Sequence, residues 1–126
     1  MSAADTFKAG VEAGDIEAAF SALADDVVLH SPVTFKPFEG KAVVGHVLRN
    51  VFEVFSDFRY TDHLREGATS ILVFKANVGD RAIDGIDLVR ENADGLIHDF
   101  TVMVRPLSGL TALAEEMGRR LGAPPA

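Results

Sequence analysis

The sequence has no cysteine, no tryptophan and a single tyrosine, Tyr60. The lack of cysteine excludes disulfide bonds, thiolate catalysis and cysteine-ligated zinc or iron–sulfur sites. Nine phenylalanines supply nearly all of the aromatic volume, so little of that volume carries a polar group. No apolar run approaches the roughly 20 residues that a membrane-spanning helix needs, and the first ten residues lack the apolar core of a signal peptide. We therefore expect a soluble, cytoplasmic protein.

Positive charge is also scarce, because 12 basic residues stand against 19 acidic ones and the net charge is −7. The basic residues are scattered along the chain, which argues against binding to nucleic acid or to an anionic membrane. The four histidines, His30, His46, His63 and His98, share no spacing typical of metal ligands. No phosphate-binding glycine loop or zinc helix is present. The sequence therefore predicts no metal site and no cofactor.

The hydrophobic pattern predicts one domain over residues 1–126, in which helices pack against an antiparallel sheet. Gly14 is placed to end a first helix, and Asp15 is placed to cap a second helix that carries Ile16, Phe20 and Leu23. Asp94-Gly95 favours a hairpin turn. The remaining expected elements are helices at 3–13, 41–55 and 107–121, a short strand at 27–30, and strands at 57–66, 69–78, 81–91 and 96–105. This order is typical of an α+β fold.

The long strands are apolar on both faces. In the third of them, Ile83 and Val89 alternate with Ile86 and Leu88. The helices of the same chain can cover only one face of the sheet. We therefore expect a homodimer that forms through the outer sheet face.

Asp87 is the principal candidate for chemistry. With a two-residue hairpin loop within 92–95, Asp87 shares a face with His98, Phe100 and Val102. An ionised carboxylate among apolar side chains is costly, so its pKa should rise and the neutral acid could donate a hydrogen bond. Gly85, two residues away, would leave room for a ligand. The alternative is that Asp87 faces solvent or pairs with an arginine of the sheet.

The sequence resembles the SnoaL-like group of the nuclear transport factor 2-like superfamily over nearly its whole length. The resemblance rests on four segments taken in order: Gly14-Asp15-Ile16-Glu17, Leu23-Ala24-Asp25-Asp26-Val27-Val28, the loop from Pro32 to Gly40, and Gly85-Ile86-Asp87 leading to Asp94-Gly95-Leu96-Ile97. It implies a cone in which helices pack on the concave face of a curved antiparallel sheet and enclose a deep apolar cavity. It also implies dimerisation through the outer sheet face.

The superfamily includes isomerases, cyclases, hydrolases, dehydratases and non-catalytic binders, so the fold alone does not imply one reaction. In the steroid isomerase branch, the resemblance assigns Asp87 to the oxyanion-stabilising acid. The position of the general base is occupied here by Ser31, and that of the oxyanion tyrosine by Phe7. The cyclase and epoxide hydrolase branches have an aspartate where this chain has Val102. None of these activities can be transferred directly.

The candidate site therefore centres on Asp87, with His98 and His30 as possible catalytic partners. His30 neighbours Ser31 and should point away from the cavity unless Pro32 bends the strand. The residues expected to contact a ligand are Phe7, Ser31, Phe52, Tyr60, Gly85, Phe100 and Val102. Three functions remain open: acid–base catalysis of the isomerase, hydratase or cyclase type on a small apolar compound, non-catalytic binding of such a compound, and a dimerisation module.

Overall fold

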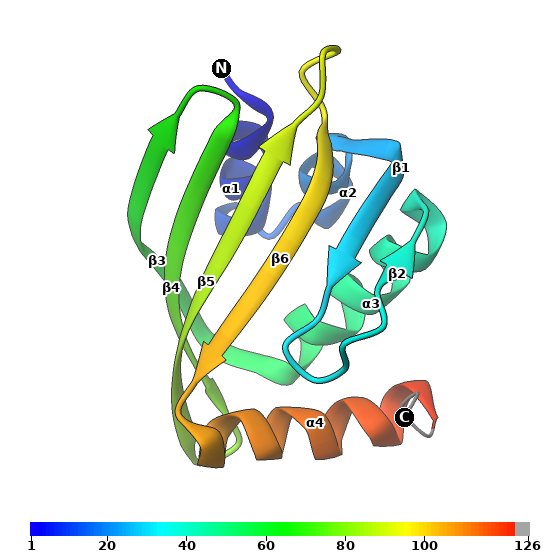
Figure 1. The fold of residues 1–126 in the computed structure, drawn as a ribbon. Helices are drawn as coiled ribbons and strands as arrows, with labels where there is room; N and C mark the ends of the chain where they lie inside the picture. Colours follow the sequence, from blue (N-terminus) through cyan, green and yellow to red (C-terminus); the bar gives the residue numbers. More distant parts are fainter. Residues whose placement is uncertain (123–126) are drawn as a thin grey trace.

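The computed structural model describes residues 1–122, which form a six-stranded sheet and four helices (Figure 1). Within these residues, no helix has the length and apolar character needed to cross a membrane. In chain order, the elements are α1 (Ala3–Glu12), α2 (Ile16–Phe20), β1 (Leu23–His30), β2 (Phe38–Glu39), α3 (Lys41–Val54), β3 (Phe55–Glu66), β4 (Thr69–Val78), β5 (Arg81–Glu91), β6 (Ile97–Arg105) and α4 (Leu107–Leu121).

Most of the predicted elements are confirmed. The expected strands 69–78 and 81–91 and the final helix 107–121 agree residue for residue. Gly14 has φ +71°, and the Asp15 carboxylate accepts the backbone N–H of Ala18 at 3.1 Å, as expected for the end of one helix and the cap of the next. The α+β fold class is therefore correct.

The second helix is shorter than predicted because β1 begins at Leu23. Leu23 pairs with Ile97 of β6, and the backbone N–H of Ile97 donates to the carbonyl of Ala22 at 2.9 Å. Leu23, which was predicted to lie in the second helix, is therefore the first residue of β1. The two residues of β2, Phe38–Glu39, form a further strand that the sequence pattern did not reveal.

The strands are arranged in the order β2-β1-β6-β5-β4-β3. All neighbours are antiparallel except β1 and β6, which run parallel. The expectation of a purely antiparallel sheet therefore fails at this one pair. β3 carries two register shifts, between Ser56 and Arg59 and between Tyr60 and Asp62. Such bulges bend a strand and increase its twist, which helps β3 and β4 to curl over the concave side.

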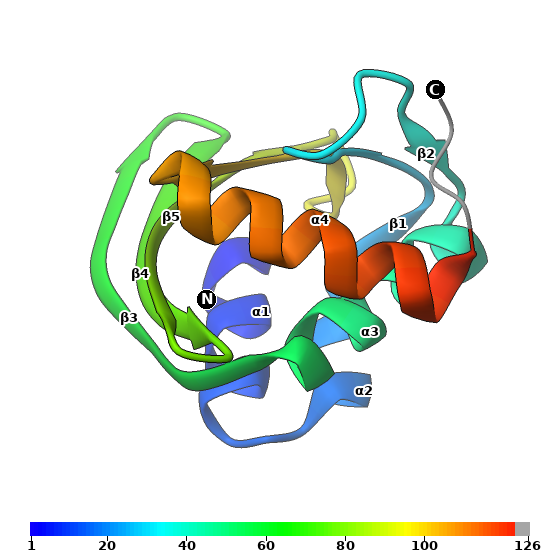
Figure 2. The ribbon, with the colours of Figure 1, turned by 90° about the horizontal axis from the view of Figure 1, so that it is seen from below.

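The curled sheet does not close into a barrel, and the helices fill its concave side. Figure 2 shows α1 lying within the curl and α4 crossing its open end. Phe7 of α1 is fully buried, and its ring lies 5.2 Å from that of Phe100 on β6. α1 and α2 approach closely at Gly10, where a Cβ atom would lie 2.4 Å from the backbone nitrogen of Ala19. This contact fixes the two N-terminal helices together at the end of the sheet opposite α4 (Figure 1).

Candidate functional site

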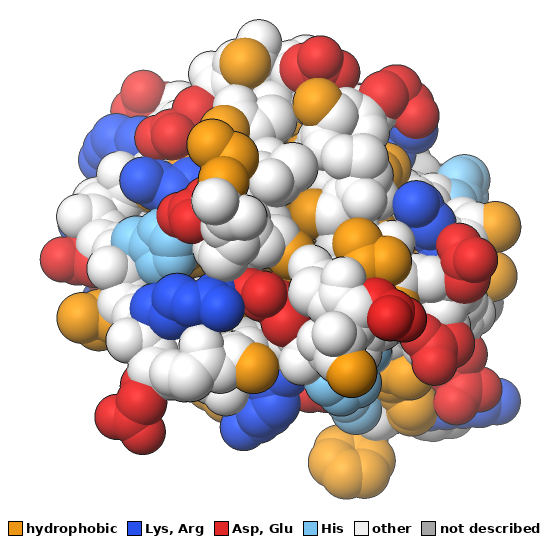
Figure 3. All heavy atoms as spheres, turned by 90° about the horizontal axis from the view of Figure 1, so that it is seen from above, with side chains coloured by type: hydrophobic (Ala, Val, Ile, Leu, Met, Phe, Trp, Pro, Cys, Tyr) orange, Lys and Arg blue, Asp and Glu red, His pale blue; other side chains and the backbone are white. Residues whose placement is uncertain are grey.

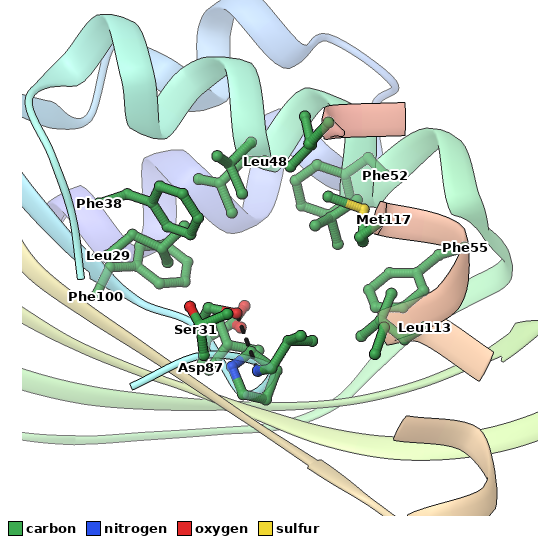
Figure 4. Close-up of a pocket in the computed structure, with 18 of the residues that line it drawn as sticks. Leu29, Ser31, Phe38, Leu48, Phe52, Phe55, Asp87, Phe100, Leu113 and Met117 are labelled. Atoms are coloured by element: carbon green, nitrogen blue, oxygen red, sulfur yellow. Dashed lines mark hydrogen bonds between the residues drawn. The ribbon is translucent and has the colours of Figure 1, made fainter. Parts of the chain in front are cut away.

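An apolar cavity of about 150 Å³ lies between the concave face of the sheet, α3, α4 and the loop that follows β1. Figure 4 shows its residues converging from these elements. Only three polar side chains, those of Ser31, Thr34 and Asp87, are among its 22 lining residues, and none of the lining residues is basic. Its aromatic wall comprises Phe38, Phe52, Phe55, Phe58, Phe74 and Phe100. The cavity therefore suits an uncharged, largely apolar molecule.

The register of the sheet places Asp87 at the cavity. On β5, Asp87 pairs with Leu72 of β4 on one side and with Val102 of β6 on the other. Strand alternation turns this row of side chains toward the concave face. Asp87 is only 5% exposed, and no hydrogen bond or neighbouring charge within residues 1–122 contributes to the pKa of its carboxyl group. The prediction that Asp87 points inward among apolar neighbours agrees with this placement, and the solvent-facing alternative does not.

Burial determines the protonation state of Asp87. Desolvation raises the pKa of its carboxyl group from 3.8 to about 8, because the charged form loses its hydration inside the fold. At neutral pH the group is therefore mainly a neutral acid that can donate one hydrogen bond. The cavity wall, as residues 1–122 form it, contains no basic side chain whose positive charge could stabilise the carboxylate.

Ser31 lies at the start of the loop between β1 and β2. Its hydroxyl oxygen accepts the backbone N–H of Val33 at 3.0 Å, which bends the chain into a short turn. Ser31, Pro32, Val33 and Thr34 all line the cavity. The loop therefore forms part of the cavity wall.

Five of the predicted site residues do line the cavity: Ser31, Phe52, Asp87, Phe100 and Val102. They come from the loop after β1, from α3, from β5 and from β6. Alternation along the strands and the stripe along the predicted helix 41–55 indicated four of them, whereas Ser31 was included on the basis of the family resemblance. The other five predicted residues lie elsewhere.

Neither predicted histidine accompanies Asp87. The Nε2 atom of His30 lies 3.0 Å from a carboxylate oxygen of Asp99, outside the cavity, and Arg90 contacts the other oxygen at 3.5 Å. His98 is exposed, because the ladder pairs Arg90 with Asp99 but Glu91 with Ile97, leaving His98 as the extra residue of a bulge. The expected two-residue hairpin loop is replaced by the longer connection 92–96, and the parity argument fails at that point.

Gly85 does not leave room for a ligand. A Cβ atom at this position would lie 2.1 Å from the ring of Phe74, so the space of the missing side chain is taken by that ring. Phe7 belongs to the core beneath Phe100 and also lies outside the cavity wall. In both cases, packing within the chain uses the volume that the sequence interpretation assigned to a ligand.

Tyr60 projects from β3 into the interior but does not line the cavity. Its hydroxyl group is buried and has no hydrogen-bond partner within residues 1–122. Burial, and then the negative charges of Asp87 and Glu12, raise the pKa of this phenol far above its ordinary value. The phenol therefore stays neutral and cannot act as a base at neutral pH.

Sequence interpretation missed the contribution of α4. Leu113, Met117 and Leu121 recur along one face of this helix and line the cavity, together with Gly118. The same stripe was recognised as the buried face of a helix, but a stripe does not show whether it meets other side chains or an open volume. Within residues 1–122, no group of three or more histidine, aspartate or glutamate side chains is arranged to hold a metal ion.

Comparison with known proteins identifies relatives that share this architecture. A steroid delta-isomerase from Pseudomonas aeruginosa is 44% identical, with a TM-score of 0.88 over 94% of this chain and 90% of that one. An uncharacterised bacterial protein with a cystatin-like fold from Silicibacter pomeroyi is 35% identical, with a TM-score of 0.89 over 94% of this chain and 84% of its own. No curated protein matches the chain significantly. The model of the SnoaL-like domain matches residues 4–100. The chain therefore belongs to the SnoaL-like family, whose structural neighbours here have the nuclear transport factor 2-like fold.

Proposed function

We propose that the protein binds a small, neutral, largely apolar molecule in the cavity and that Asp87 exchanges a proton with it. One observation carries this proposal: Asp87 is the only ionisable side chain among the lining residues, and it is buried without an internal partner. A neutral acid in this position can donate its proton to a carbonyl oxygen of the ligand. The carboxylate that remains can then remove a proton from the carbon next to that carbonyl.

These two transfers convert a ketone into its enol and return Asp87 to its protonated form, so no other reactant is needed. The similarity to a chain described as a steroid delta-isomerase supports a reaction of this kind. Because Ser31 and Phe7 replace the base and the tyrosine of that branch, Asp87 would have to act as both acid and base. We therefore restrict the proposal to proton transfer on a neutral carbonyl compound.

Non-catalytic binding is the second candidate. The scarcity of ionisable groups favours this candidate, because the cavity lining offers one acid and no second ionisable residue to serve as the general base. In that case, the hydrogen bond from Asp87 would only orient the ligand.

Hydrogen–deuterium exchange distinguishes the two candidates. The bicyclic ketone 1-decalone would be incubated in D₂O with the protein, and deuterium uptake at the carbons next to its carbonyl would be followed by mass spectrometry. Binding would be followed by NMR. Acid–base catalysis predicts a rate increase of roughly 10²-fold or more that Asp87→Asn abolishes. Asp80→Asn is the control, because the Asp80 side chain is 98% exposed and remote from the cavity lining. Binding without exchange would favour the second candidate, and the absence of any binding would refute both.

We propose, in addition, that the partner of the outer sheet face is a second copy of the chain. A contiguous apolar patch crosses three strands there, because the register pairs Ile71 with Leu88, Val73 with Ile86, and Ile86 with Met103. Met103 is 53% exposed. In contrast, the end of the molecule seen in Figure 3 carries charged side chains of both signs with scattered hydrophobic ones.

The charges beside this patch are partly balanced within the chain. Asp84 contacts Lys75 at 2.7 Å and Arg105 at 2.6 Å. Two copies can therefore approach face to face without strong repulsion between these groups, despite the net charge of −7. Sedimentation velocity tests the proposal: the native chain should sediment as a dimer and Ile86→Arg as a monomer, whereas a monomeric native chain would refute it. We also propose a cytoplasmic location, as the sequence indicates, which cell fractionation would test.

A further inference from the structure

Ser31 supplies the cavity with a second hydrogen-bond donor. A serine hydroxyl carries one hydrogen and two lone pairs. Because the oxygen of Ser31 accepts the backbone N–H of Val33 at 3.0 Å, one lone pair is already used. The hydroxyl hydrogen has no acceptor within residues 1–122, and the side chain lines the cavity. The hydroxyl hydrogen and one lone pair therefore remain free, and the hydrogen allows Ser31 to donate a hydrogen bond to a ligand in the cavity.

The third polar side chain does not compete for this role. The Thr34 hydroxyl donates to the backbone carbonyl of Lys36 at 3.3 Å, so its hydrogen is already committed. The cavity wall therefore carries two polar hydrogens without an acceptor within residues 1–122, on Ser31 and on the neutral carboxyl group of Asp87. A donor left unpaired in an apolar enclosure is costly, and a bound molecule that offers an acceptor removes that cost.

The two donors share one wall of the cavity. In Figure 4, Ser31 and Asp87 lie across the cavity from Leu48 and Phe52 of α3. The remaining lining side chains are apolar apart from Thr34. A ligand that satisfies both donors would therefore carry its polar atoms along one edge and an apolar body toward the helices.

We propose that the cavity takes a neutral ligand with two oxygen acceptors on one edge, such as a diketone, a keto ester or a lactone, and that Ser31 is the specificity-determining residue that recognises the second oxygen. This inference rests on the proposed function, since it assigns a substrate class to the same cavity. It goes further because it gives a role to a residue that stands where the steroid isomerase branch has its base. Ser31 then selects the ligand rather than removing a proton from it.

A matched series of probes tests the assignment. The probes are decalin, 1-decalone and three decalindiones that differ in the position of the second carbonyl group, with affinities measured by NMR titration at pH 6. In the native protein, at least one decalindione should bind more tightly than 1-decalone, and 1-decalone more tightly than decalin. Ser31→Ala should lower the affinity for that decalindione roughly fivefold and leave the affinity for 1-decalone unchanged, as expected for the loss of one neutral hydrogen bond.

Thr34→Val is the control, because the hydroxyl that it removes is already bonded within the chain. It should alter the preference for the decalindione by less than twofold. The affinity of 1-decalone also reports whether Ser31→Ala has disturbed the loop that Ser31 helps to bend.

The outcomes separate this inference from the proposed function. If 1-decalone binds but no decalindione gains affinity, or if Ser31→Ala weakens both equally, the role of Ser31 is refuted while the proposed binding function stands. If none of the probes binds, both are refuted. A preference that survives in Ser31→Ala but disappears in Thr34→Val would assign the second contact to Thr34 and overturn the assignment to Ser31.

Discussion

Asp87→Asn should change the pH dependence of stability in a way that no exposed acid can reproduce. The Asp87 carboxyl group has a pKa of about 8 in the native state, against an ordinary value of 3.8, because burial disfavours its charged form. Between these pH values the native protein therefore holds a proton that the unfolded chain releases. The free energy of unfolding must fall as the pH rises through this window and then level off above it.

The size of the effect follows from the two pKa values. Each pH unit between these two pKa values lowers the free energy of unfolding by up to about 1.4 kcal/mol, so the total loss across the window is at most about 6 kcal/mol. This is comparable to the entire stability of many small domains. An asparagine at this position stays neutral at every pH and loses this dependence. The stability of Asp87→Asn relative to the native protein should therefore increase steadily from pH 4 to pH 8.

Urea unfolding followed by far-ultraviolet circular dichroism at pH 5, 6, 7 and 8 provides the measurement. The difference in unfolding free energy between Asp87→Asn and the native protein should grow by up to about 1.4 kcal/mol per pH unit. Asp80→Asn, which alters a side chain that is 98% exposed, should follow the native profile. Parallel profiles for the native protein and Asp87→Asn would show that Asp87 ionises normally and would refute the account of a buried neutral acid.

Five further substitutions test the packing around the site and the residues assigned to it. Gly85→Ala should destabilise the protein by about 1–3 kcal/mol in chemical unfolding, because its Cβ atom would overlap the Phe74 ring. In the double variant, Phe74→Leu should relieve part of that cost. If the effects of the two substitutions on the free energy of unfolding simply add, the predicted overlap is contradicted. His30→Gln and His98→Gln should leave the affinity for 1-decalone unchanged, since both side chains lie outside the cavity, and a loss of binding in either would place that histidine in the site. Met117→Ala should enlarge the cavity beside α4 and lower the free energy of unfolding by about 2–5 kcal/mol. Thermal unfolding measures the loss of stability, and binding of bulkier ketones reports the larger cavity. Unchanged stability would show that Met117 is not packed as described.

The sequence alone determined the class of the fold, and it offered an inward orientation of Asp87 as one of two open alternatives. Both follow from local periodicity: a carboxylate on strand 81–91 shares its face with every second residue, and the facing positions of the next strand are apolar. Because Arg81 and Arg90 lie on the same strand, the sequence left open whether Asp87 is buried or pairs with an arginine. The motifs of the family added the concave sheet and the cavity.

Only the tertiary structure decided which side chains share the cavity with Asp87. The bulge at His98 depends on the geometry of the hairpin connection, which shifts the register by one residue and reverses the parity assumed from the sequence. The occupation of the space above Gly85 by Phe74 is a contact between two strands. The placement of α4 across the open end likewise arises from long-range packing, which turns an ordinary amphipathic stripe into one wall of the site. Periodicity shows which way a side chain points along its own element, whereas the three-dimensional arrangement of the elements decides what it meets there.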